Sequence, residues 1–170
     1  MAGAKKRARK RRSIFEKERL RPSQIYAVAD RRFRDAVCLR DDDNSERANG
    51  AMYLGGFVVE CLLKARLIEC HAWLERGRPD EGASASDQEA WDLCYRQHNL
   101  SEILRLLPEL KRELSAGGSL QHSPYRSLQS VCAEWTIYAR YSARQATRDE
   151  AREFIARVKE IRDWLERNRR

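Results

Sequence analysis

Two residues of opposite charge, Glu60 and Lys64, lie in the middle of a strongly apolar stretch, "YLGGFVVECLLKARLIECH" at residues 53–71. They are four residues apart, with the glutamate first, which is the better orientation for an ion pair on one helix face. One interpretation is a structural pair, partly buried where helices or subunits meet. The other is a binding cleft, in which Lys64 contacts a phosphate and Glu60 holds the ammonium group in place.

The spacing of polar residues around this pair predicts a stripe along one helix face. At about 100° per residue, the stripe contains Asn49, Tyr53, Gly56, Glu60, Lys64 and His71. The other faces are apolar, so this helix should be the centre of the fold. Glycine in a helix costs about 1 kcal/mol relative to alanine, so Gly56 indicates that another backbone or a ligand comes close to the stripe.

Helical periodicity extends over most of the chain, and we find no strand pattern. It predicts helices from Pro22 to the acidic run at 41–46, over about 46–74, around 90–95, over 98–110, from a Ser123 cap through residue 139, and from a Thr147–Glu150 capping box to Leu165. We expect the fifth of these to turn Trp135 and Tyr138 inward. The sequence therefore predicts an all-α fold, an antiparallel up-and-down bundle of five or six helices.

Composition supports one helical domain. The chain has 170 residues, of which 42% are hydrophobic and 35% charged, with only eight glycines and four prolines. The five cysteines form no C-x-x-C pair, which suits reduced thiols in a cytosol: Cys38, Cys61, Cys70, Cys94 and Cys132. No run approaches the roughly 18 apolar residues of a spanning helix. We expect a cytoplasmic localisation and no membrane contact.

The charge is concentrated at the N-terminus. The net charge is +8, and seven of the positive charges come from one short run: Lys5, Lys6, Arg7, Arg9, Lys10, Arg11 and Arg12. We interpret residues 1–20 as a disordered basic arm and residues 21–170 as the helical bundle. Such an arm suits a polyanion such as nucleic acid or a nuclear-type address that a receptor recognises, or it serves only to increase solubility.

Four segments in order carry a resemblance to a known family: "AMYLGGFVVECLLKARL", "HNLSEILRLL", "WTIYARY" and "AREFIARVKEIRDWL". Together they resemble the HEPN domain family over about residues 22–167. The resemblance implies an α-helical bundle that commonly dimerises and that binds, or acts on, nucleotides or RNA. Prokaryotic members are often encoded beside a minimal nucleotidyltransferase, as toxin and antitoxin or as paired subunits.

The resemblance also assigns residues. The family's helix-two glutamate and lysine match Glu60 and Lys64. Its His-x-Leu motif matches His98 and Leu100, and its Arg-Tyr pair matches residues 140–141.

One expected motif is missing. Ribonuclease members of the family use an arginine followed after four to six residues by a histidine, and here "ARYSARQATRDE" has Arg140 and Arg144 but no histidine. The same spacing occurs once elsewhere, at Arg66 and His71. Five residues on a helix turn two side chains about 140° apart, so this pair should point to different faces.

We therefore predict a non-catalytic nucleotide- or RNA-binding domain, and we expect a homodimer with a possible nucleotidyltransferase partner. Lys64 and Arg140 would contact an anion, and Tyr141 or Tyr53 would stack on a base, with Glu60 orienting Lys64.

Two alternatives remain open. One is a metal-independent ribonuclease built on Arg66–His71 or around Arg144, and the other is a protein-binding adaptor or antitoxin-like module. We expect no cofactor and no metal site. Cys70, His71, Cys94 and His98 could be drawn as zinc ligands, but their spacing matches no established zinc motif.

Overall fold

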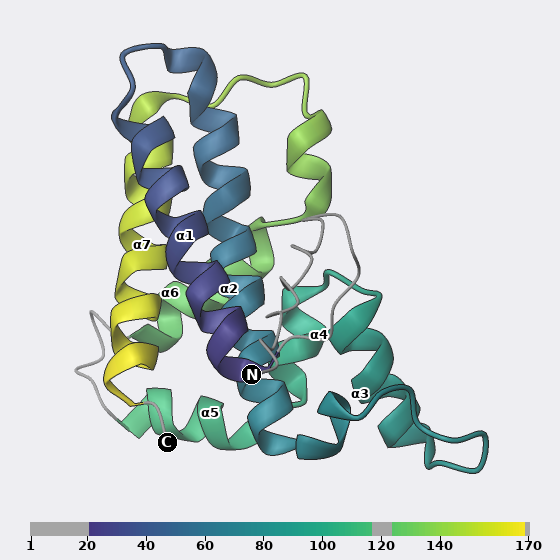
Figure 1. Ribbon diagram of the computed structural model, residues 1–170. Helices are drawn as coiled ribbons and strands as arrows, with labels where there is room; N and C mark the ends of the chain where they lie inside the picture. The colour runs from purple at the N-terminus through teal and green to yellow at the C-terminus, as the bar shows by residue number, and fades with distance from the viewer. Residues whose placement is uncertain (1–20, 117–123, 169–170) are drawn as a thin grey trace, which may run out of the picture.

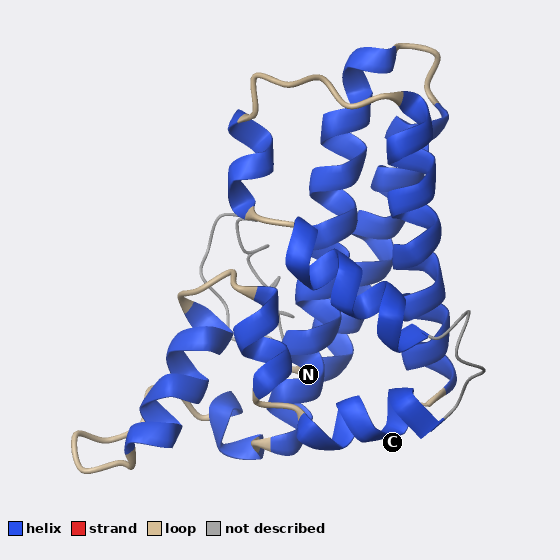
Figure 2. Cartoon of the chain, turned by 180° about the vertical axis from the view of Figure 1, so that it is seen from behind, coloured by secondary structure: helices blue, strands red, loops and turns tan. Residues whose placement is uncertain are grey.

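The structure is a computed structural model, and it describes residues 21–116 and 124–168. Within these ranges the chain is all-α, with seven α-helices, three short 3₁₀ helices and no strand, as Figure 2 shows. The predicted all-α bundle is confirmed. The basic arm at residues 1–20 and the expected Ser123 cap lie outside the described residues.

Three long helices form the body of the bundle: α1 (Pro22–Asp41), α2 (Ala48–Cys70) and α7 (Arg148–Arg167). They lie side by side in Figure 1. At the beginning of α7, Arg148 pairs with Asp43, just past the end of α1, and later in the helix Arg162 pairs with Asp30 of α1. α1 therefore runs antiparallel to α7, whereas α2 and α7 run in the same direction.

α2 is the central helix, as the sequence predicts. Its side chains are buried on nearly every side, and Leu62, Leu63, Leu67 and Ile68 are among the largest fully buried groups of the protein. Gly55 lets α7 approach closely, because a Cβ atom there would lie 2.6 Å from Ile155 Cδ1. Burial of this kind removes apolar area from water and provides most of the stability of such a bundle.

Local sequence signals explain where the long helices begin. Pro22 occupies the first turn of α1, where its missing N–H costs nothing. Asn44 caps a 3₁₀ turn, η1 (Ser45–Arg47), that leads directly into α2. The predicted capping box of α7 is present, since Thr147 Oγ1 accepts from Glu150 N at 3.1 Å and Thr147 N donates to Glu150 Oε2 at 2.8 Å.

Shorter helices lie on one side of the body and across the end of α2. These are η2 (Ala72–Glu75), α3 (Ala85–Tyr95), α4 (Leu100–Arg105), α5 (Pro108–Ala116), α6 (Pro124–Glu134) and η3 (Ile137–Tyr141). Four predicted boundaries are wrong. α3 begins at Ala85, earlier than the helix expected around 90–95. α2 ends at Cys70 rather than residue 74, because His71 leaves the helical conformation at φ −128°, ψ 70°.

The other two differences lie in the later part of the chain. The helix expected over 98–110 is divided into α4 and α5, since Pro108 starts a new helix and cannot donate to the preceding turn. The helix expected to continue through residue 139 ends at Glu134 and is followed by η3. None of the helices in the described ranges is both long and apolar enough to cross a membrane.

Candidate functional site

The polar stripe of α2 faces two connecting segments, residues 96–99 and residues 135–146. At its upper end Asn49 Nδ2 donates to Arg144 O at 2.8 Å, and Asn49 Oδ1 accepts from Ala146 N at 2.7 Å. Lower on the same stripe, Lys64 Nζ donates to Gln97 O at 2.9 Å. The stripe is therefore the surface to which both segments are attached.

Glu60 is a deeply buried member of the stripe, with only 3% of its side chain exposed. Its Oε1 atom lies 2.7 Å from Lys64 Nζ and 2.9 Å from His98 Nδ1. Its Oε2 atom is buried and has no hydrogen-bond partner in the described part of the chain. The predicted ion pair of Glu60 and Lys64 is confirmed, and it includes a histidine from another segment.

Lys64 fixes the segment that carries this histidine. Its ammonium group bonds both Glu60 and the carbonyl of Gln97, the residue directly before His98. Asn99 then caps α4, because its Oδ1 accepts from Glu102 N at 3.2 Å. The ammonium group thus already has two protein partners, and these contacts hold the backbone that positions His98.

His98 connects this buried cluster to a hollow of about 420 Å³. The hollow is bounded by Arg96, Gln97, His98, Asn99, Cys132, Ala133, Trp135, Thr136, Ile137 and Tyr138. The imidazole is 44% exposed, although its Nδ1 atom is bonded to a buried carboxylate. A ring held from one side and open on the other is well placed to contact a ligand.

The group that comes close to Gly56, as the sequence predicted, is the side chain of Trp135. A Cβ atom at position 56 would lie 2.0 Å from Trp135 Cδ1, so only glycine leaves room for the indole. The indole also stacks on Tyr53 at 6.2 Å between ring centroids and donates from Nε1 to Tyr53 O at 3.1 Å. The close neighbour of the stripe is thus a protein side chain, which forms part of the hollow's wall.

Beside the hollow, η3 presents an aromatic surface. Tyr138 and Tyr141 are 72% and 70% exposed, and they are the large exposed hydrophobic residues of the described chain. The Arg140 guanidinium lies 4.6 Å from the centre of the Tyr141 ring. Our prediction that Tyr138 turns inward is wrong, because α6 ends before it and the following backbone turns outward.

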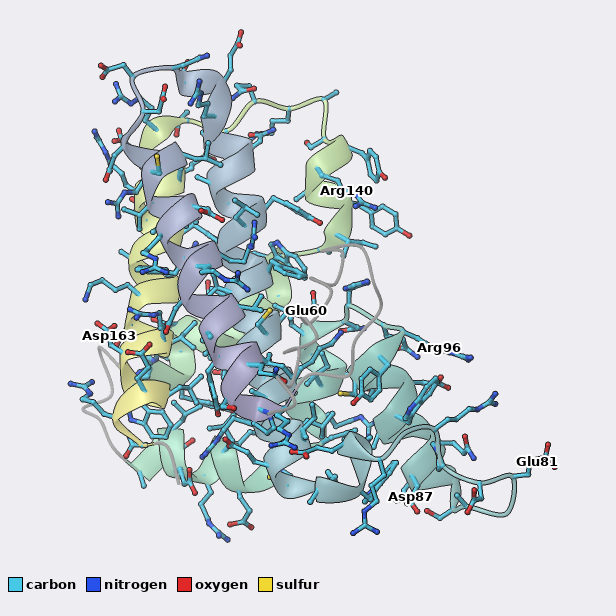
Figure 3. All side chains as sticks on the ribbon, viewed as in Figure 1. Glu60, Glu81, Asp87, Arg96, Arg140 and Asp163 are labelled. Carbon is cyan, nitrogen blue, oxygen red and sulfur yellow. The ribbon has the colours of Figure 1, made fainter. Side chains whose placement is uncertain are left out.

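A second arginine–aromatic cluster lies on the other side of the hollow. Arg96 lies 4.8 Å and Arg78 5.8 Å from the centre of the Trp91 ring. Figure 3 shows Arg96 and Arg140 on the same side of the molecule. The sequence did not single out this cluster, and proximity to His98 along the chain was the signal that could have indicated Arg96.

Arg66 and His71, the pair of the ribonuclease alternative, contact different parts of the fold. Arg66 is buried and donates to Glu69 at 3.2 Å and to Glu113, on α5, at 3.1 Å. His71 lies past the end of α2, with its ring edge-on to Trp73 at 6.4 Å. Each of the two side chains is thus engaged with a different set of neighbours.

Arg144 is also away from the hollow's wall. It is exposed and bonds Glu150 at 2.6 Å, at the beginning of α7. Together with the backbone and hydroxyl of Thr147, this bond lowers the pKa of Glu150 from 4.5 to about 2.

The cysteines separate into exposed and buried groups. Cys38 and Cys70 are exposed, and burial raises the pKa of Cys61 to about 12, that of Cys94 to about 11 and that of Cys132 to about 12. Among the residues that the structure describes, no three His, Cys, Asp or Glu side chains are grouped to hold a metal ion. The zinc set considered from sequence therefore does not assemble.

No protein-family model, curated protein or solved structure matches this chain. The resemblance to the HEPN family rests on the sequence motifs alone.

Proposed function

We propose that this chain is a HEPN-like domain that binds a nucleotide or an RNA strand without cleaving it. The observation that carries the proposal is the surface of η3, where Tyr138 and Tyr141 are exposed next to Arg140. This surface borders the hollow that His98 and Trp135 help to line.

The exposure of two tyrosine rings has no evident benefit for folding, because neither ring removes its apolar area from water. A nucleic-acid base could cover such a ring, and stacking of this kind contributes about 1–3 kcal/mol per base. Arg140 and Arg96 would supply positive charge for phosphates on either side of the hollow. Stacking and phosphate contacts together favour a nucleotide ligand over an uncharged one.

The size of the hollow also suits this ligand class. Small-molecule sites usually have volumes of about 300–1,000 Å³ and combine apolar walls with a few convergent polar groups. The hollow of about 420 Å³ lies in this range. Its wall includes the Trp135 indole as well as the polar groups of Arg96, His98 and Asn99.

The proposal excludes cleavage by the family's arginine–histidine mechanism for a local reason. Residues 139–150 contain no histidine, and Arg66 is buried against two carboxylates away from His71. The resemblance further suggests a homodimer and a nucleotidyltransferase partner, and both remain proposals.

The basic arm would contribute separately. Its seven cations at residues 5–12 lie outside the described residues, and such a run binds polyanions without regard to sequence. Each phosphate contact adds about 0.7–0.9 to the slope of log K against log salt. Replacing the seven cations by serine in the full chain should flatten this slope and leave small-nucleotide binding unchanged.

The central experiment compares binding of a fluorescently labelled single-stranded RNA to the full chain and to variants. Tyr141→Ala and Tyr138→Ala should each weaken binding about fivefold or more, because each removes one stacking surface. Arg140→Ala should weaken binding and also reduce its salt dependence. Arg112→Ala is the matched control, since Arg112 is also an exposed arginine and lies on α5, away from the hollow.

The outcomes of this experiment distinguish binding at η3 from a general effect of charge and from RNA cleavage. If both tyrosine variants bind like the unaltered chain, η3 is not the binding surface. If Arg112→Ala weakens binding as much as Arg140→Ala, the effect is one of total charge. RNA cleavage in the absence of metal, abolished by His71→Ala in a folded protein, would replace the binding proposal by the ribonuclease alternative.

A further inference from the structure

The hydrogen bonds of Glu60 determine which nitrogen of His98 carries a proton. Glu60 Oε1 lies 2.7 Å from the Lys64 ammonium group, which can only donate. The oxygens of a carboxylate in an ion pair with this cation act only as hydrogen-bond acceptors. The bond of 2.9 Å to His98 Nδ1 consequently has Nδ1 as its donor.

The role of Nε2, the second ring nitrogen of His98, follows from the role of Nδ1. When the imidazole is neutral and Nδ1 carries the proton, Nε2 has a lone pair and acts as an acceptor. None of the residues that the structure describes forms a hydrogen bond to Nε2, and the half-exposed ring lines the hollow. The hollow thus contains a hydrogen-bond acceptor whose orientation is fixed from behind by a buried ion pair.

This acceptor contrasts with the other recognition groups around the hollow. The guanidinium groups of Arg96 and Arg140 can only donate, and they suit phosphate oxygens. The Tyr138 ring can stack on any base. Neither kind of contact distinguishes ribose from deoxyribose, or adenine from a base without an amino group.

We propose that His98 is a specificity-determining residue, whose Nε2 accepts a hydrogen bond from a donor group of the bound nucleotide. The donor is either a ribose 2′-hydroxyl or an exocyclic amino group of the base. This inference rests on the proposed function, because it names what the same site selects. Glu60 and Lys64 act as positioning residues that keep the acceptor nitrogen toward the ligand.

The expected selectivity is moderate. A site that is built to accept a hydrogen bond discriminates against an analogue that lacks the donor, because its polar group then loses a partner. The ring is 44% exposed, so water can partly replace the missing donor. One net hydrogen bond of this kind corresponds to an affinity difference of about 3- to 10-fold.

The first test measures the tautomer directly in the full chain, without any ligand. Long-range ¹H–¹⁵N correlation spectra show which ring nitrogen of each neutral histidine carries the proton. His98→Gln identifies the signal of His98 among the three histidines. A proton on Nδ1 is expected, and a proton on Nε2 alone would overturn the inference.

The second test identifies the donor by comparing three oligonucleotides of one length, made of riboadenosine, deoxyadenosine or riboinosine. Weaker binding of the deoxy strand indicates the 2′-hydroxyl, and weaker binding of the inosine strand indicates the amino group. His98→Phe, which keeps a ring but removes the acceptor, should abolish the preference. His98→Leu, which also lacks an acceptor, takes its place if the phenylalanine variant does not fold. His98→Gln offers an acceptor amide and should retain part of the preference.

His71→Phe is the matched control, because this ring lies against Trp73 and not along the hollow. It should retain the full preference. If the chain binds all three strands equally well, the proposed function stands and the role of His98 is wrong. If the chain binds none of them, the proposed function and the ligand specificity are both overturned.

Discussion

Two buried charge clusters occupy the same helix, and they differ in how completely they are closed. Arg66 gives one terminal nitrogen to Glu69 and the other to Glu113, so α2 and α5 together enclose it. Glu60 has a single bonded oxygen, and its cluster leads through His98 to the hollow. The Arg66 cluster joins two helices, whereas the Glu60 cluster joins a helix to a surface that a ligand can reach.

This difference between the Arg66 and Glu60 clusters indicates whether a buried charge has a structural or a binding role. A charge whose partners are all protein groups gives little reason to infer a binding role, since it serves packing and orientation. Glu60 keeps one buried oxygen without a partner in the described residues, which is an unfavourable arrangement for stability alone. Costs of this kind concentrate at functional sites.

The largest predicted effect is a loss of unfolding free energy, which should be greater for the Glu60 cluster than for the Arg66 cluster. Lys64→Met leaves Glu60 buried without its cation and should cost about 3–5 kcal/mol. Arg66→Met should cost less, because Glu69 and Glu113 are each 27% exposed and water can partly solvate them. Unfolding in urea, monitored by circular dichroism, gives both values.

A double variant provides the control for this comparison. Replacing Glu60 by leucine together with Lys64→Met removes both charges and should recover much of the lost stability. Small and equal losses in the single variants would contradict the idea that the Glu60 pair is closely coupled.

The second prediction concerns Trp135, whose indole lines the hollow near the Glu60 cluster. Alanine gains about 1 kcal/mol over glycine in a helix. At Gly56, however, the new Cβ would lie 2.0 Å from Trp135, and overpacking of this kind costs about 1–3 kcal/mol. Gly56→Ala should therefore destabilise the protein and weaken ligand binding, as measured by thermal unfolding and RNA titration.

Gly50 in the same helix supplies the matched control. A Cβ atom there would meet only the Leu39 side chain, at 3.3 Å. Gly50→Ala should be neutral or stabilising by up to about 1 kcal/mol. An equal loss in both variants would mean that the contact of Gly56 with Trp135 has no special importance.

A third charge pair, Arg144 with Glu150 at the protein surface, sets the baseline for the two buried clusters. Because Glu150 has its pKa lowered from 4.5 to about 2, its contribution to stability is present above pH 4.5 and is lost as the pH falls toward 2. Compared with Glu150→Gln, the unaltered chain should lose its extra stability across that interval. A difference that is constant from pH 7 to pH 2 would contradict the pairing with Arg144 and Thr147.

The smallest predicted effect is chemical and leaves the fold unchanged. Cys61 lies next to Glu60, and burial raises the pKa of its thiol to about 12, whereas Cys70 near the Arg66 cluster is exposed. A thiol reagent at pH 8 should modify Cys70 and Cys38 quickly and Cys61 only after unfolding. Peptide mass spectrometry identifies the modified residues, and rapid labelling of Cys61 would show that the Glu60 side opens to solvent.

The sequence predicted those parts of the fold that depend on local patterns. The capping box at Thr147 and the apolar periodicity of α2 are read from neighbouring residues, and both are confirmed. The end of α2 was not predictable, because Trp73 and Leu74 continue the apolar spacing past His71. The outward turn of Tyr138 depends on where α6 stops, which the apolar spacing of residues 128–139 does not mark.

In the candidate site too, contacts between neighbouring residues were predictable and contacts between distant residues were not. The pairing of Glu60 with Lys64 follows from four-residue spacing on one helix. Their contacts with His98 and Gln97 join residues more than 30 positions apart, and only tertiary packing determines these contacts. The close approach at Gly56 was predicted, but the identity of Trp135 as the neighbour required the fold.

The two hydrogen bonds of Asn49 also have a consequence for the order of folding. They join residues 95 and 97 positions apart, whereas α1 and α2 are consecutive in the chain. Contacts between distant residues close long loops and form slowly, so we expect the α1–α2 hairpin to form early and the segment that ends at α7 to dock late. The hollow needs residues from both 96–99 and 132–138, so binding competence should be acquired in the last step of folding.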